Sequence, residues 1–156
     1  MYKFFSEKTR LHYIIYADYH QFDFIALKFY AKKDRKSSRK YSNIINKGDV
    51  GNILTTCAKC IPELLKIYPN ASFGFVGART IDVETDKIEG YKTNQRYRVY
   101  KYHIPQLIGN KTFLHKSFPN ASAYALINKN NDVTTLEEKI KNMICDTYPD
   151  LLNFNL

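Results

Sequence analysis

The stretch "GDVGNILTTCAKCIPELLKIYP" (48–69) decides the fold, because it carries the clearest secondary-structure signal in the chain. Its apolar residues follow the three- and four-residue spacing of one helical face: Val50, Ile53, Leu54, Cys57, Ala58, Ile61, Leu64, Leu65 and Tyr68. Asp49 is a suitable N-cap, and Pro69 ends the pattern. Pro62 lies within the pattern and removes one backbone donor, so we expect a kink near Ala58 rather than the end of the helix. The pattern therefore predicts one long amphipathic helix.

Strands are predicted on the N-terminal side of this helix. Residues 11–17 and 22–31 are rich in β-branched and aromatic residues, and the short "DYHQ" between them suits a hairpin. Neither face of 22–31 is clearly polar, so we expect this strand to be covered on both sides. Residues 39–46 are a plausible third strand.

The C-terminal half alternates strands with helices. We predict strands at 71–78, 112–118 and 121–129. A second helix follows Thr93 or Asn94 and ends at Pro105 and Gly109, and a third has a capping box, because Thr134 and Thr135 each precede a Glu by three residues. The order of elements predicts a single α+β domain over residues 1–156, with a mostly antiparallel sheet of four to six strands and about three helices packed on it.

Charge is unevenly distributed along the chain, whose net charge is +9. Residues 1–48 contain eleven lysines and arginines against four acids, whereas residues 49–156 contain thirteen against eleven. The excess lies in "KKDRKSSRK" (32–40), which we predict to be a flexible basic loop, and 79–92 is an acidic loop. A basic run attracts polyanions. The alternative is a solvated loop in a chain whose lysine content reflects an AT-rich genome.

Other function classes find little support in the sequence. There is no run of roughly 20 apolar residues and no N-terminal apolar signal core, so we expect no membrane partner and a cytoplasmic location. Cys57 and Cys60 form a C-x2-C pair without a second pair, and we interpret them as buried core residues. The four histidines show no metal-ligand spacing and no glycine-rich nucleotide motif occurs, so we expect no metal and no cofactor, and we assign no catalytic residue.

The second helix begins with "NQRYRVYKYH" (94–103), and its residues divide between two faces. Tyr97, Tyr100, Ile104 and Leu107 form the stripe that we expect in the core. The cations are left on the remaining surface. With Arg79, which follows the strand containing Gly77, Arg96 and Arg98 could converge on a phosphate, because the guanidinium fork binds phosphate oxygens in pairs. The alternative is that these arginines pair with the acids of the 82–89 stretch.

The predicted nucleic-acid or phosphate-binding residues come from the basic loop, the strand end and the second helix. They are Lys32, Lys33, Arg35, Lys36, Arg39, Lys40, Arg79, Arg96, Arg98, Lys101 and Tyr102.

Several of these positions form a pattern that resembles a family of small uncharacterised bacterial proteins, a domain of unknown function. The resemblance covers roughly residues 10–130 and consists of Gly48 and Asp49 before the helix, Gly77 closing the next strand, and the R-x-R-aliphatic-Tyr run at 96–100. It implies a bacterial or phage-type cytoplasmic protein and no activity. We separately expect an association with defence or mobile elements. The chain departs from the pattern where the acidic loop separates Gly77 from the arginine helix.

Three functions are compatible with these features. The first is binding of nucleic acid through its phosphate backbone, with Tyr102 stacking on a base. The second is a small toxin-type nuclease or another enzyme with a phosphate-containing substrate, in which Arg96 and His103 would act. The third is a protein-interaction module, such as an antitoxin, immunity or host-takeover protein with a protein partner. We expect the first, and we favour binding over catalysis.

Overall fold

Six strands form one sheet in the spatial order β1-β2-β3-β4-β6-β5. The strands are β1 (Tyr2–Ser6), β2 (Leu11–His20), β3 (Phe24–Ala31), β4 (Ser72–Val76), β5 (Phe113–Phe118) and β6 (Ala123–Asn128). The helices are α1 (Val50–Ile67), α2 (Gln95–Leu107) and α3 (Val133–Thr147), with short 3-10 helices η1 (Lys32–Asp34) and η2 (Pro119–Ala121). This is a computed structural model, and it describes residues 1–43, 48–79, 81 and 87–147.

Only one pair of neighbouring strands in this sheet is parallel. Strands β1, β2 and β3 form an antiparallel meander, and β4, β6 and β5 are also joined by antiparallel pairs. Strands β3 and β4 run parallel, and α1 lies between them in sequence. Their register covers only Phe24–Ala26 opposite Ser72–Gly74, and residues 27–31 continue β3 beyond it. The predicted α+β class with a mostly antiparallel sheet is confirmed.

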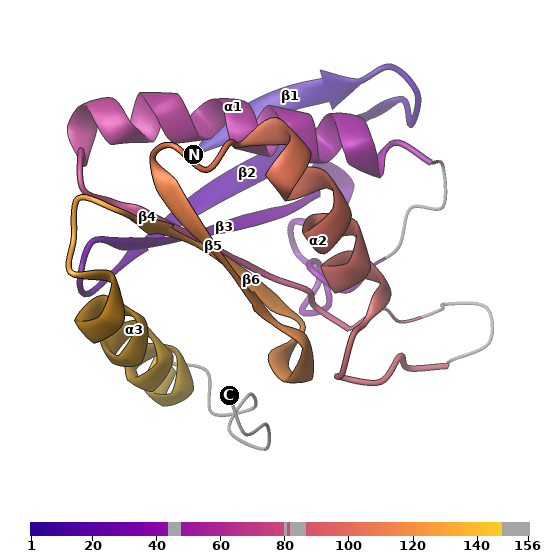
Figure 1. Ribbon diagram of the computed structural model, residues 1–156. Helices are drawn as coiled ribbons and strands as arrows, with labels where there is room; N and C mark the ends of the chain where they lie inside the picture. Colours follow the sequence, from indigo (N-terminus) through magenta and orange to yellow (C-terminus); the bar gives the residue numbers. More distant parts are fainter. Residues whose placement is uncertain (44–47, 80, 82–86, 148–156) are drawn as a thin grey trace.

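The helices cover both faces of the sheet. Helices α1 and α2 lie on one face and α3 lies on the other (Figure 1). Alternate residues of β3 enter the two cores: Ile25 and Leu27 pack with α1 and α2, whereas Phe24 and Ala26 pack with α3. Strand β3 is therefore buried on both faces, as its apolar sequence predicts.

The β3–β4 junction depends on a glycine. Gly74 lies beside the ring of Phe24, and a Cβ atom at position 74 would overlap that ring. The missing side chain of β4 therefore makes room for an aromatic residue of the core under α3.

Helix α1 matches the prediction in extent, and the centre of the predicted stripe is buried, whereas Tyr68 at its end is 37% exposed. Ile53, Leu54, Cys57, Cys60, Ile61 and Leu64 are buried. The helix continues through the exposed Pro62. Asp49 occupies the N-cap position, but its side chain does not cap the helix, which differs from the prediction.

Two of the three N-terminal strands, β2 and β3, are those that the sequence predicts, and the third is a different one. Residues 39–42 form turns, and among residues 39–43 only Asn43 makes a bridge, with Ile81. The strand predicted at 39–46 is therefore wrong over its described part, and 44–47 lie outside the described residues. Strand β3 is paired with β2 along its whole length and with β4 over Phe24–Ala26, and residues 39–42 form turns instead of adding a strand beside it. The third strand is β1, an edge strand whose lysine and exposed Phe5 weaken its apolar pattern.

Helix α2 is capped by Asn94, one of the two predicted caps. The Asn94 Oδ1 atom accepts a hydrogen bond of 2.9 Å from the backbone N–H of Tyr97, and its Nδ2 atom donates to the carbonyl of Gly77. The Ser122 Oγ atom in turn accepts from the Asn94 backbone N–H at 3.0 Å. This buried residue therefore fixes the start of α2 to the ends of β4 and β6. At the other end of the predicted stripe Leu107 is 38% exposed, so its assignment to the core is wrong.

Replacement of Asn94 by Ala should lower the free energy of unfolding by about 2 kcal/mol, because it removes the cap and leaves the buried Gly77 carbonyl without its donor. Urea denaturation measures this difference. The control is Asn142→Ala, an exposed position on α3, which should not destabilise the protein. Equal stability of the two variants would contradict the structural role of Asn94.

Candidate functional site

A cavity of about 340 Å³ opens at the carboxyl end of β3, beside the start of α1. We call it the α1–α2 cavity, and its walls include Tyr13, Phe29, Lys40, Asp49, Arg96 and Tyr100. The walls therefore come from β2, β3, the basic segment (the predicted basic loop, residues 32–40), and the first turns of α1 and α2. Ligands of open sheets bind beyond the carboxyl ends of parallel strands, and β3 is one member of the parallel pair.

Arg96 projects into this cavity from the first turn of α2. Its guanidinium donates a hydrogen bond of 3.1 Å to the Asn43 carbonyl and lies 5.6 Å from the centre of the Phe29 ring. It forms no ion pair within the described ranges. Burial raises the pKa of Tyr100 to about 12, although the nearby positive charge of Arg96 opposes this rise. The guanidinium is therefore held in a half-buried position with its charge not neutralised by any described carboxylate.

Lys40 reaches the same cavity from the basic segment. Its Nζ atom lies 5.0 Å from the centre of the Tyr30 ring and 5.1 Å from that of Tyr41. The segment is organised locally by η1 and by turns, with a 2.8 Å hydrogen bond from the Ser42 backbone N–H to the Arg39 carbonyl. The turns thus bring one cation of the basic run to the cavity that Arg96 enters.

The N-terminus of α1 forms the third side of the cavity. Gly48 has a φ of 63°, a left-handed conformation that glycine adopts without strain, and its carbonyl accepts a 3.0 Å hydrogen bond from Lys8 Nζ. The Asp49 carboxylate accepts hydrogen bonds from the side chains of Ser6 and Asn52 instead of capping the helix. The first-turn N–H groups therefore keep the partial positive charge of a helix start without a side-chain cap.

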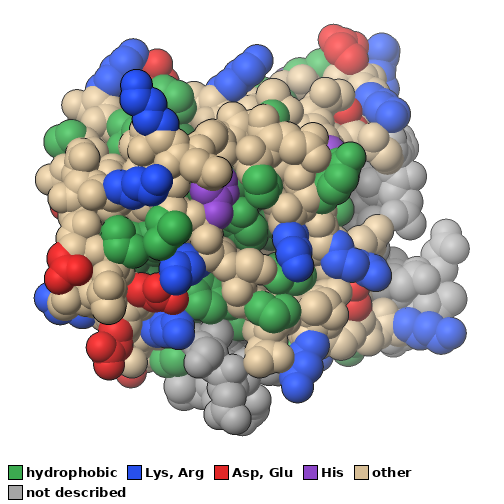
Figure 2. Space-filling view, in the orientation of Figure 1, with side chains coloured by type: hydrophobic (Ala, Val, Ile, Leu, Met, Phe, Trp, Pro, Cys, Tyr) green, Lys and Arg blue, Asp and Glu red, His purple; other side chains and the backbone are tan. Residues whose placement is uncertain are grey.

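The remaining predicted residues lie outside this cavity. Lys32, Lys33, Arg35, Lys36 and Arg39 are exposed on the basic segment, and Arg98, Lys101 and Tyr102 are exposed on α2. Figure 2 shows Lys and Arg side chains spread over the whole view, including the part where α2 lies. The structure therefore brings Lys40 and Arg96 to one cavity and leaves the other cations of these two segments exposed outside it.

Arg79 lies outside the α1–α2 cavity. Its guanidinium stacks 3.7 Å from the centre of the Tyr91 ring and lines a separate cavity of about 230 Å³ with Ser42 and Ile81. It therefore shares no cavity with Arg96. The alternative is that the arginines pair with the acids of the acidic loop. Most of those acids belong to residues 82–86, which lie outside the described residues. In the described part of that loop, Ile81 and Ile88 form an isolated bridge.

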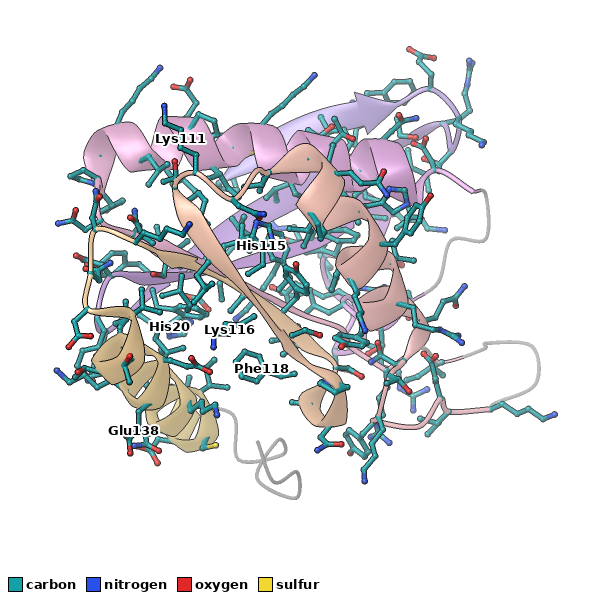
Figure 3. The ribbon with its side chains drawn as sticks, viewed as in Figure 1. His20, Lys111, His115, Lys116, Phe118 and Glu138 are labelled. Carbon is teal, nitrogen blue, oxygen red and sulfur yellow. The ribbon has the colours of Figure 1, made fainter. Side chains whose placement is uncertain are left out.

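The histidines are dispersed, as the sequence indicates. His103 is half-buried and its ring contacts Tyr102, and it is not part of the cavity wall. His115 on β5 is 2.9 Å from the Tyr124 hydroxyl, and Figure 3 shows it well apart from His20. Within the described residues no cluster of His, Cys, Asp and Glu could hold a metal ion. The same residues include no helix long and apolar enough to cross a membrane.

Sequence reasoning missed two polar residues of the cavity. The sequence predicts Tyr13 only as a strand residue, and Asp49 as a helix cap and as part of the Gly48–Asp49 pair of the family pattern. Both are buried in the cavity wall, and the Tyr13 hydroxyl has no hydrogen bond of ordinary geometry in the described part of the chain. No local sequence signal distinguishes such residues, because the cavity exists only once distant segments have packed.

Comparison with known proteins adds no further assignment. No protein-family model, curated protein or solved structure matches the chain. The resemblance to a bacterial family of unknown function therefore stays a prediction.

The C-x2-C pair is part of the hydrophobic core. Cys57 and Cys60 are buried on α1 and unpaired, and burial raises the pKa of both thiols. Neither thiol is activated, since a raised pKa lowers the fraction of reactive thiolate.

Alkylation of the native protein with iodoacetamide at pH 8 should therefore modify the half-buried Cys145 at least tenfold faster than Cys57 or Cys60. Peptide mass spectrometry measures the three rates. In 8 M urea, the control, all three should react alike, and rapid native labelling of Cys57 would argue against the packed helix.

Proposed function

We propose that the protein binds a phosphate-bearing small molecule in the α1–α2 cavity. The observation that carries this proposal is that Arg96 and Lys40, from segments far apart in sequence, line one cavity at the start of a long helix. Among the functions compatible with the sequence, this geometry favours a phosphate-containing ligand held in a pocket. The free cysteines suit a reducing compartment such as the cytoplasm.

The groups around the cavity supply what phosphate binding requires. A guanidinium donates paired hydrogen bonds to phosphate oxygens, and a helix N-terminus adds unpaired N–H donors and a partial positive charge. Asp49 is the opposing charge in the wall, but its two oxygens already accept hydrogen bonds from Ser6 and Asn52. The described wall contains two cations, Lys40 and Arg96, and one carboxylate, Asp49, so its net charge is positive.

Replacement of Arg96 by Ala should weaken binding of inorganic pyrophosphate and ribose 5-phosphate roughly 10- to 100-fold, the usual effect of losing a charge-assisted hydrogen bond. Isothermal titration calorimetry measures the dissociation constants. The matched control is Arg98→Ala, which removes an exposed arginine two residues along the same helix and should change affinity less than threefold. If the unaltered protein binds neither compound, the proposed function fails.

A second candidate is the binding of nucleic acid, and one observation favours it. The exposed cations of the basic segment (32–40) and of α2 form no ion pairs within the described ranges, and Tyr102, 66% exposed, follows Lys101 on α2. Such a surface can follow a phosphate backbone while an aromatic ring stacks on a base.

Charge reversal at Lys33, Lys36 and Arg39 together should then weaken single-stranded RNA or DNA binding at least tenfold at low salt, and it should reduce the salt dependence of binding. Fluorescence polarisation measures both. The control reverses Lys3, Lys59 and Lys111, exposed cations that change the net charge by the same amount. Equal losses in the two variants would indicate a non-specific charge effect and exclude this surface.

A further inference from the structure

We infer that the α1–α2 cavity takes a nucleoside phosphate, with the base at the buried floor of the cavity and the phosphate at its rim. This inference rests on the proposed phosphate-binding function and names the class of compound that carries the phosphate.

Burial separates the cavity wall into a floor and a rim. Tyr13 is 3% exposed and Asp49 is 4% exposed, and Tyr100 is buried to a similar degree. Lys40 and Arg96, in contrast, are only half-buried. The cations therefore lie nearer solvent than the buried carboxylate. A phosphate is stabilised at the rim by Arg96 and Lys40 and repelled from the floor by Asp49.

The floor contains an unsatisfied polar group. The Tyr13 hydroxyl is buried and has no hydrogen bond of ordinary geometry to a described residue, although the Thr9 side chain interacts with it, and such an incompletely paired buried group destabilises a protein. Burial raises the pKa of Tyr13, although the nearby Thr9 hydroxyl opposes part of the rise, so the phenol stays protonated at neutral pH. A ligand that places an acceptor beside this hydroxyl restores the missing hydrogen bond.

The floor is also aromatic, and it is larger than a phosphate needs. Tyr100 contributes a buried ring from α2, and the half-buried Phe29 contributes a ring from β3 that lies nearer the rim. A volume of about 340 Å³ falls within the range of small-molecule sites, roughly 300–1,000 Å³. A planar ring fits between aromatic side chains, and stacking on such side chains is a common mode of base recognition.

The polar groups distinguish a base from a hydrocarbon group. A hydrocarbon group would leave the Tyr13 hydroxyl unpaired and would bury the spare acceptor sites of Asp49. A nucleobase carries ring-nitrogen or carbonyl acceptors for the hydroxyl and N–H donors for the carboxylate. Buried polar groups of this kind favour ligands that pair them and reject those that do not.

The test is a titration series with AMP, GMP, CMP, UMP and ribose 5-phosphate. We expect at least one nucleoside monophosphate to bind tenfold or more tightly than ribose 5-phosphate. Tyr13→Phe should weaken that nucleotide about five- to tenfold and leave the affinity for ribose 5-phosphate unchanged, because only the base reaches the floor. The matched control is Tyr16→Phe, an exposed tyrosine of the same strand, which should have no effect.

A second variant keeps the test valid if Tyr13→Phe does not fold. Val99→Phe adds bulk to the cavity wall and should weaken the nucleotide more than tenfold while sparing ribose 5-phosphate. Equal affinity of ribose 5-phosphate and every nucleotide, or unchanged nucleotide affinity in both variants, would overturn the inference and leave the phosphate site standing. Absence of binding by any compound, ribose 5-phosphate included, would refute the proposed function itself.

Discussion

The parallel pairing of β3 with β4 determines where the other elements of the fold can lie. Two parallel neighbours in a sheet require a crossover, and here the crossover contains α1. Because the pairing ends at Ala26 and Gly74, the last residues of β3 continue without β4 beside them in the register. The start of α1 and the carboxyl end of β3 line the same cavity as a result. The site is therefore a consequence of topology, and side chains then determine its chemistry.

The hydrogen bonds of Asn94 position the wall of the cavity that α2 contributes. Asn94 connects the start of α2 with the carbonyl of Gly77 after β4 and, through its backbone N–H, with Ser122 before β6. The first turn of α2 is thereby fixed to the end of the sheet. Arg96 lies in that turn, so its guanidinium is positioned by buried hydrogen bonds of the backbone around it as well as by its own bond to Asn43.

Much of the fold could be predicted from the sequence because the signals were local. The helical stripe of 50–68 and the apolar runs of β3 and β6 are strong patterns of this kind. The sequence does not predict the edge strand β1, because the exposed Lys3 and Phe5 weaken its apolar pattern, and it wrongly predicts a strand from residue 39, because composition does not show that the chain turns there. The same limit applies to the site. Arg96 and Lys40 were predicted as cations of two segments, but their meeting at one cavity, the separation of Arg79, and the buried Tyr13 hydroxyl all depend on tertiary packing.

The contact between Gly74 and the Phe24 ring has a mechanical consequence. Phe24 belongs to the core under α3, whereas the cavity lies on the opposite side of the sheet. A residue larger than glycine at position 74 would displace this ring and disturb the packing of α3. It would not enter the cavity, whose strand residues are Tyr13 of β2 and the last residues of β3.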